Sequence, residues 1–317
     1  MKKIVILMAT YNGEKYIEKQ IVSIMQQTYS NWELIIQDDG SVDNTKKIID
    51  GFVKKDARIH LTDNLTDFHG AYENFYTLIK RLQSNEFKID FDYIALSDQD
   101  DIWEQDRLAF ETQKLNKMCT IPCLVYSDYR VIDGMGKVVL ASANAGIGLV
   151  PKPKEALFFA NAYVWGNTVM FNKLLLDVLV ISNDVLASKH PHDAYLAKVA
   201  TIVGSIEYID RILVNYRRFS GNVSSTMWYK LSIVGVLKKA NLLKRAETLG
   251  VTLDQGLLVI HQYGSVKQYE LKLAMLKGGL TGIKYLLKHR IRRQQVLRTI
   301  SIYIVLATGW YKKWLKG

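Results

Sequence analysis

Tyr93-Ile94-Ala95-Leu96 leads directly into Ser97-Asp98-Gln99-Asp100-Asp101-Ile102-Trp103. Apolar residues that end in a polar cluster are typical of a buried strand whose carboxyl end faces a binding site. Carboxylates this close together repel one another unless a cation lies among them, and Mg²⁺ or Mn²⁺ prefers such oxygen ligands. Because these ions usually share their coordination with substrate phosphates, the stretch predicts a metal and diphosphate site.

Before residue 93, short apolar runs typical of strands alternate with segments whose apolar residues recur every three or four positions, as in helices. They predict strands at 4–8, 32–36 and 58–61, and helices at 14–27, from 45 onward and at 70–82. This alternation favours a mostly parallel sheet flanked by helices, so the expected fold class is α/β. Polar clusters follow residues 8, 36 and 96. Binding sites in such sheets lie beyond the carboxyl ends of the strands, so we expect these clusters to meet.

The pattern is less regular beyond residue 123. It predicts strands at 124–126, 130–132 and 212–216, an extended segment at 164–171, a helix at 192–203, and a loop at 141–155. The loop is predicted from its glycines and prolines, which interrupt regular structure.

The positive charge of the chain is concentrated in its C-terminal part. The 317 residues carry a net charge of +11, yet residues 229–317 alone contain 17 Lys/Arg and 3 Asp/Glu, a net of +14. Residues 1–228 therefore carry a net of −3. The shift predicts a large α/β domain over residues 1–228 and a basic, amphipathic helical region over residues 229–317.

The basic region has the composition of helices that lie on anionic lipid, with tryptophan and tyrosine among lysines. Its longest uncharged stretch, residues 299–311, is too short to cross a bilayer. A solvated helical lid and a protein-binding surface explain the same charge, whereas nucleic acid is not expected because no supporting motif is present. Cys119 and Cys123 lack the further ligands of a zinc site and are expected to be reduced, buried thiols.

A series of short motifs, in this order, resembles the bacterial glycosyltransferase family 2, whose members have the Rossmann-like GT-A fold. The resemblance covers residues 1 to about 225. The Asp-Gln-Asp-Asp-Ile-Trp form is most similar to the rhamnosyltransferase branch, which builds cell-wall and capsule polysaccharides. The matching pieces are Ala9-Thr10-Tyr11-Asn12-Gly13, Gln26-Gln27-Thr28, Asp38-Asp39-Gly40-Ser41-Val42-Asp43-Asn44-Thr45, Ser97-Asp98-Gln99-Asp100-Asp101-Ile102-Trp103, Trp165-Gly166-Asn167-Thr168, Pro191-His192-Asp193 and Tyr216-Arg217.

The resemblance implies roles for the acidic residues. Asp98 and Asp100 match the family's Asp-x-Asp pair: Asp100 would bind Mg²⁺ or Mn²⁺, and Asp98 the metal or the ribose of the nucleotide-sugar. Asp101 would orient the loop or the donor sugar, and a role in capping the next helix explains it nearly as well. Asp39 matches a carboxylate that accepts a hydrogen bond from N3–H of uracil or thymine. Asp38 fits either a similar role or an ordinary turn.

The resemblance also implies residues that border the donor nucleotide and a residue that contacts its diphosphate. Thr10, Tyr11 and Glu14 match a segment that borders the base and ribose, although a plain turn after a strand uses similar residues. Many relatives have a histidine near the diphosphate at the position of Phe219. Its absence leaves Arg217 or the next arginine to neutralise the diphosphate, since guanidinium groups fit phosphate oxygens.

Asp193 matches the position of the family's catalytic base. It begins a predicted helix, where the helix dipole favours an anionic side chain, and one carboxylate suffices for a single displacement. An ordinary helix-capping role is the alternative. His192 is assigned to packing or to the acceptor side of the site. Trp165 and Asn167 would line the acceptor cleft, and a buried core tryptophan is just as common.

These features together predict an inverting, metal-dependent glycosyltransferase. The resemblance implies a dTDP- or UDP-sugar donor, a saccharide or lipid-linked saccharide acceptor, and a cytoplasmic, peripheral location at the inner face of the plasma membrane. A sugar-nucleotidyltransferase is less compatible with the sequence, because residues 10–14 contain no basic, glycine-rich loop. A non-catalytic, membrane-associated partner in a polysaccharide assembly complex stays open, because Phe219 replaces the expected histidine.

Overall fold

Two units make up the chain, and the computed structural model describes residues 1–118, 120–219 and 239–316. The first unit comprises Met1–Ala143, Val164–Asp193 and Gly204–Ser225, and the second comprises Asn144–Tyr163, Ala194–Val203 and Thr226–Gly317. The sequence pattern had assigned 144–163 and 194–203 to the α/β part. The predicted domain boundary after residue 228 lies outside the described residues and stays a prediction. Cys119 is also outside them, while Cys123 is buried, as predicted.

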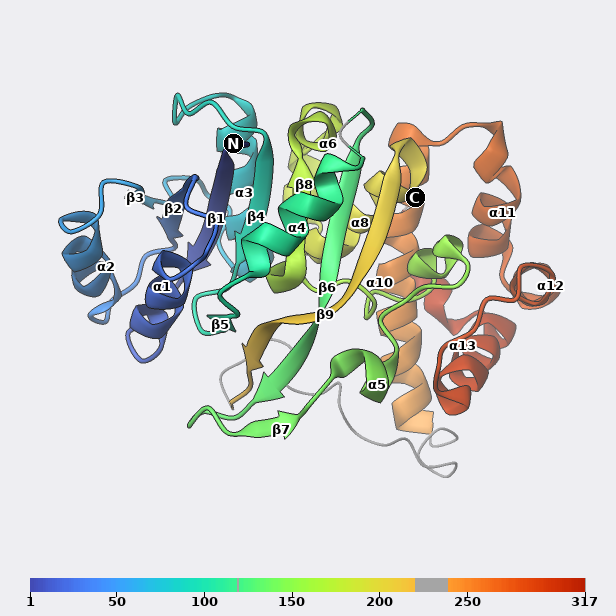
Figure 1. The fold of residues 1–317 in the computed structure, drawn as a ribbon. Coiled ribbons are helices and arrows are strands. Elements are labelled where there is room, and N and C mark those ends of the chain that lie inside the picture. Colours follow the sequence, from blue (N-terminus) through green and yellow to red (C-terminus); the bar gives the residue numbers. More distant parts are fainter. Residues whose placement is uncertain (119, 220–238, 317) are drawn as a thin grey trace. The chain divides into compact units, whose positions relative to one another are not determined.

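The first unit contains a single mixed sheet, with strand order β3-β2-β1-β4-β8-β6-β9-β5 and β7 paired to β6 (Figure 1). Strands β3, β2, β1 and β4 are parallel, β8 is antiparallel to both of its neighbours, and β9 is parallel to β6. The strands are β1 (Ile4–Thr10), β2 (Trp32–Asp38), β3 (Ile59–Asp63), β4 (Tyr93–Ser97), β5 (Ile102–Trp103), β6 (Cys123–Ile132), β7 (Val138–Leu140), β8 (Val169–Asn172) and β9 (Ser205–Arg217). The expected α/β fold class is confirmed.

Helices of the first unit bury apolar stripes. In α1 the side chains of Ile17, Ile21 and Ile24 are fully buried, as the spacing of the apolar residues predicts. Strand β1 is buried along almost its whole length, the usual state of a parallel strand with both faces covered. The helices are α1 (Ile17–Met25), α2 (Thr45–Val53), α3 (Ala71–Gln83), α4 (Arg107–Asn116), α6 (Lys173–Val178) and α7 (Asn183–Ala187).

The strand register brings the polar clusters to one edge of the sheet. Thr10 at the end of β1 pairs with Asp38 at the end of β2, and Met8 pairs with Ser97 at the end of β4. Strand β8 enters at this same edge, because it runs antiparallel to β4. Strand β9 ends there as well, since it is parallel to β6, which is antiparallel to β8. The prediction that these clusters lie at a common edge is confirmed.

Two segments differ from their sequence-based predictions. The predicted loop at 141–155 contains α5 (Ala143–Ile147) and the start of the 3₁₀-helix η1 (Lys154–Phe158). Glycine content suggested a loop, but the Asn144 side chain accepts a hydrogen bond from the Leu149 N–H and stabilises the turn. The predicted extended segment at 164–171 begins instead with the 3₁₀-helix η2 (Gly166–Thr168), in which Thr168 bonds back to the Trp165 carbonyl.

The described part of the second unit is helical, as predicted for the basic region. Its C-terminal elements, drawn in orange to red in Figure 1, are α10 (Lys239–Tyr263), η3 (Val266–Gln268), α11 (Tyr269–Lys277), α12 (Gly279–Lys288), α13 (Val296–Thr308) and η4 (Trp310–Trp314). The second unit also receives residues 194–203 of α8 (His192–Val203), a helix that begins in the first unit. Among the described helices, none has the length and hydropathy needed to cross a bilayer.

Candidate active site

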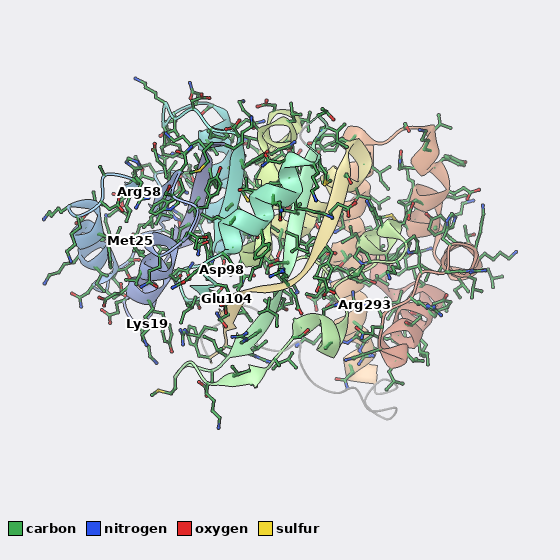
Figure 2. The ribbon with its side chains drawn as sticks, in the orientation of Figure 1. Lys19, Met25, Arg58, Asp98, Glu104 and Arg293 are labelled. Carbon is green, nitrogen blue, oxygen red and sulfur yellow. The ribbon has the colours of Figure 1, made fainter. Side chains whose placement is uncertain are left out.

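Three aspartates lie together where β4 ends. Asp98, labelled in Figure 2, and Asp100 are half-buried, and Asp101 is fully buried. Burial and then the neighbouring carboxylates raise the pKa of all three side chains above the ordinary value for aspartate. A divalent cation would reduce the repulsion among these carboxylates.

Asp193 lies in the same electrostatic environment. Its charge contributes to the raised pKa of Asp98, after burial and Asp101. Asp193 is the second residue of α8, and its Oδ2 accepts a hydrogen bond of 2.9 Å from the Gly166 N–H. This bond and the helix N-terminus both favour the carboxylate form. The structure thus brings the predicted base and the predicted metal-binding aspartates together.

Tyr72 is a member of this group that the sequence did not single out. It lies in the first turn of α3, half-buried, with its ring centroid 6.1 Å from that of His192. Burial, followed by the charges of Asp193 and Asp98, raises the pKa of Tyr72 to about 12. Its hydroxyl is therefore protonated at neutral pH and lies within electrostatic reach of both carboxylates.

The turn after β1 is fastened to the aspartate segment by Gln99. The Gln99 Oε1 accepts hydrogen bonds from the Thr10 hydroxyl at 2.6 Å and the Tyr11 N–H at 3.0 Å, and its Nε2 donates to the Tyr11 carbonyl. Thr10 is buried, whereas Tyr11 is about half exposed. A Cβ on Gly13 would lie 2.3 Å from the Gln99 Oε1, so a larger residue there would displace the Gln99 amide from these hydrogen bonds. Thr10 is thus held within the protein, and the predicted donor contacts of Thr10 and Tyr11 stay predictions.

Asp38 and Asp39 have different environments at the end of β2. Asp38 is fully buried, and its carboxylate accepts hydrogen bonds from the Gly40 and Ser41 N–H groups and the Ser41 hydroxyl. It therefore has the turn role. The Asp39 carboxylate accepts from Asn64, from the Gly70 N–H, and contacts the His69 ring at 2.8 Å. These bonds fix its position at the edge of the sheet, and its predicted contact with a base stays a prediction.

Glu14 is exposed, and its side chain contacts Asn44, the residue that precedes α2. Its Oε2 accepts hydrogen bonds of 2.9 Å from both the backbone and the side-chain nitrogen of Asn44. Glu14 thus connects the turn after β1 to α2, which is the structural alternative to its predicted contact with the donor.

The three residues predicted for the acceptor side are all buried. Trp165 packs against the rings of Tyr129 and Tyr216, with centroids 5.6 and 5.8 Å away. Asn167 donates its side-chain amide to Asp101. His192 stacks on Phe75 at 4.1 Å, and burial lowers the pKa of His192 to about 3, so the ring is neutral. Each therefore supports the site from within the protein, and a direct acceptor contact stays a prediction.

Arg217 is almost completely buried at the end of β9. Its backbone N–H donates to Asp101 at 2.8 Å, and its Nε donates to the Asp100 carbonyl at 2.8 Å. Its Nη1 donates to the carbonyls of Asp133 and Gly134. The Nε and Nη1 atoms of the guanidinium thus bond to backbone oxygens, and the predicted contact with a diphosphate stays a prediction.

Comparison with known proteins agrees with this geometry. Residues 5–130 match the model of the family described as Glycosyl transferase family 2. This part of the chain is therefore similar to family 2 glycosyltransferases. A dTDP-rhamnosyl transferase of Shigella flexneri, RfbG, is 38% identical over 122 residues, which cover 38% of this chain and 38% of that protein. The match thus spans well under half the length of this relative.

Solved structures resemble the whole chain in fold. TarS 1–349 of S. aureus in complex with UDP-GlcNAc has a TM-score of 0.55 at 14% identity, over 97% of this chain and 92% of that one. The mannosyltransferase PcManGT of Pyrobaculum calidifontis in complex with GDP-Man and Mn²⁺ has a TM-score of 0.52 at 15% identity, over 100% and 88%. The chain therefore has the GT-A fold.

The aspartates at the end of β4 fit a hard divalent cation. Asp98 and Asp100 supply oxygen donors whose pKa is raised by burial and then by neighbouring carboxylates. Among the described residues, no group of three or more His, Cys, Asp or Glu side chains is arranged to hold a metal. Mg²⁺ and Mn²⁺ do not need such a group, because they commonly take one or two carboxylates and complete their coordination with substrate phosphates and water. The donor set thus fits a cation that arrives with a diphosphate.

Few features of the sequence point to the remaining site residues. Gln99 lies inside the quoted motif, so its spacing from the aspartates could have identified it. Tyr72 carries no motif, and only the packing of α3 places it beside Asp193. Arg107 of α4 is likewise known only from the structure: it is fully buried, forms an ion pair with Glu111, and lowers the pKa of Asp98 and Asp101 against the dominant effect of burial.

Proposed function

We propose that this chain is a metal-dependent, inverting glycosyltransferase that moves a sugar from a nucleotide-sugar to a saccharide in cell-surface polysaccharide synthesis. The observation that carries the proposal is the juxtaposition of Asp98 and Asp100 with Asp193 at one edge of the sheet. Transfer needs a group that stabilises a departing diphosphate and a base that deprotonates the acceptor hydroxyl. The first unit offers residues for both tasks.

Asp100 and Asp98 would hold Mg²⁺ or Mn²⁺, and the cation would neutralise charge on the diphosphate. Asp193 would accept the proton of the attacking hydroxyl. Its hydrogen bond from Gly166 fixes the direction of the carboxylate, so the proton acceptor is held in place before the substrate arrives. Tyr72, protonated and beside both carboxylates, would donate to a donor or acceptor oxygen.

The donor is proposed to be a dTDP- or UDP-sugar, with rhamnose as the first sugar to test. The similarity to RfbG, named as a dTDP-rhamnosyl transferase, supports this choice. The position of Tyr11 and Asp39 just after β1 and β2 supports a donor contact, because ligands of such sheets bind beyond the carboxyl ends of the strands.

The acceptor is proposed to be a saccharide or a lipid-linked saccharide. The chain would then act as a peripheral protein at the inner face of the plasma membrane. The basic residues of the second unit support this location. Lys284 and Lys288 of α12 lie on one exposed helix face with Leu280 and Leu287, the pattern of a helix that lies on anionic lipid.

Hydrolysis and transfer assays test the proposal. Purified protein is incubated with dTDP-rhamnose, UDP-glucose or UDP-N-acetylglucosamine, with Mn²⁺ or with EDTA, and nucleoside diphosphate release is measured. We expect release from one donor, and its loss in EDTA. No release from any nucleotide-sugar, with or without saccharide acceptors, would favour the non-catalytic partner instead.

A further inference from the structure

Asp101 joins three segments that are far apart in the sequence. It is fully buried, so its carboxylate cannot reach a substrate. Its Oδ1 accepts the Arg217 N–H at 2.8 Å, and its Oδ2 accepts the Asn167 side-chain amide. The residue that follows Asp100 is thereby tied to η2 and to the end of β9.

Arg217 adds a second set of bonds to the same segment. Its Nε holds the Asp100 carbonyl at 2.8 Å, and its Nη1 holds the Asp133 carbonyl at 3.1 Å. Asp133 belongs to the turn between β6 and β7. Because one planar guanidinium bonds to both, it fixes the Asp100 backbone relative to a neighbouring hairpin.

An aromatic ring covers the guanidinium. The Arg217 Cζ lies 4.7 Å from the centre of the Tyr16 ring. The Tyr16 ring lies in turn 5.0 Å from that of Phe219. Phe219 therefore packs against the ring that covers Arg217.

We propose that Asp101, Asn167 and Arg217 are positioning residues that fix Asp98 and Asp100 for cation binding, and that Arg217 is not a ligand of the donor diphosphate. The proposal rests on the proposed function, since it concerns the same cation. Residues that orient metal ligands typically change metal affinity by about 10- to 100-fold when substituted. A phosphate ligand instead changes nucleotide affinity even when no metal is present.

Two titrations separate these roles. Calorimetry measures the affinity of the full chain for Mn²⁺ alone, and for UDP or dTDP in EDTA. For Arg217→Lys, which keeps the charge but loses the planar fork, we expect Mn²⁺ affinity to fall about 10-fold and nucleotide affinity in EDTA to stay unchanged. Arg211→Lys, the same exchange on the exposed side of β9, is the matched control and should leave both affinities unchanged.

Asn167→Ala provides an independent variant, because it removes one hydrogen bond to Asp101 and does not replace a charged side chain. We expect it to lower Mn²⁺ affinity about 10-fold, and the double variant with Arg217→Lys to lose less than the product of the single losses, since both act through Asp101. Thermal melting establishes that each variant is folded. If Arg217→Lys does not fold, the Mn²⁺ affinity of folded Asn167→Ala tests the proposal by itself.

The proposal is overturned by either of two results. One is an unchanged Mn²⁺ affinity in folded Asn167→Ala. The other is a loss of nucleotide affinity in EDTA for Arg217→Lys, which would make Arg217 a phosphate ligand. Failure of the proposed function gives a different result, because the unmodified chain would then release no nucleoside diphosphate from any donor.

Discussion

Asp193 is the residue on which the proposed chemistry depends most directly. Asp193→Asn keeps the size and the Gly166 contact but removes the proton acceptor. We expect donor affinity within about two-fold of the unmodified chain and transfer reduced by about 10²–10⁴-fold. Donor affinity by calorimetry and transfer rate under saturating donor check this prediction. A transfer rate close to that of the unmodified chain would show that another group removes the proton.

The raised pKa values of Asp98 and Asp100 predict that the affinity of the site for Mn²⁺ depends on pH. Burial first, and then neighbouring carboxylates, raise the pKa of Asp98 to about 8 and that of Asp100 to about 7. Protons therefore compete with Mn²⁺ through the neutral range, and Mn²⁺ affinity should rise by more than 10-fold from about pH 6 to about pH 8. Calorimetric titration at both pH values measures it, and equal affinities would contradict the prediction.

The same aspartates affect stability without metal. Their folded pKa lies above the unfolded value near 4, so the folded state binds more protons and stability falls as pH rises from about 4 to about 8. Mn²⁺ should therefore raise the melting temperature more at the higher pH. Asp100→Asn should weaken this difference. Asp90→Asn, at an exposed position before the opposite end of β4, should leave it unchanged.

Helix α8 depends on a buried lysine for its packing in the second unit. Lys198 is fully buried, and its Nζ donates to the Gln255 Oε1 of α10 at 2.6 Å and to the Asn161 Oδ1 at 2.8 Å. Gln255→Leu removes one of these partners from a buried ammonium. We expect a loss of about 2 kcal/mol in the free energy of unfolding, by urea denaturation. Glu247→Ala, exposed on the same helix, should change it by less than about 0.5 kcal/mol.

Individual elements could be predicted from the sequence where a single periodicity dominated. Strands β1, β2 and β4, which end at Thr10, Asp38 and Ser97, were predicted because apolar residues dominate their sequences. Helix α5 was missed, since its stability comes from hydrogen bonds such as that of Gln295 with the Gly146 carbonyl, 149 residues away. Bonds of that kind leave no local pattern.

The same contrast between local sequence patterns and long-range contacts holds for the residues of the candidate site. Asp98, Asp100 and Asp193 could be singled out because their motifs are contiguous in sequence, and the structure brings them together. The backbone hydrogen bonds of Arg217 could not be predicted, because a sequence does not tell whether a guanidinium faces solvent or backbone carbonyls.

At the scale of the whole molecule, the charge distribution predicts binding to anionic lipid. The full chain should sediment with vesicles that contain phosphatidylglycerol, hardly at all with phosphatidylcholine alone, and less as salt is raised. Exchange of both Lys284 and Lys288 for glutamate should weaken binding about 10-fold or more. The same exchange at Lys54 and Lys55, at the end of α2, is the control. Equal binding to both lipids would contradict the prediction.

The two units are interleaved along the chain, because 144–163 and 194–203 leave the first unit and return to it. A single recombination junction near residue 225 would separate Phe158 from Gly256 and Lys198 from Gln255, contacts that lie within the second unit. Chimeras between relatives therefore require several matched junctions. The first unit of this protein therefore cannot be exchanged with that of a relative as one contiguous segment.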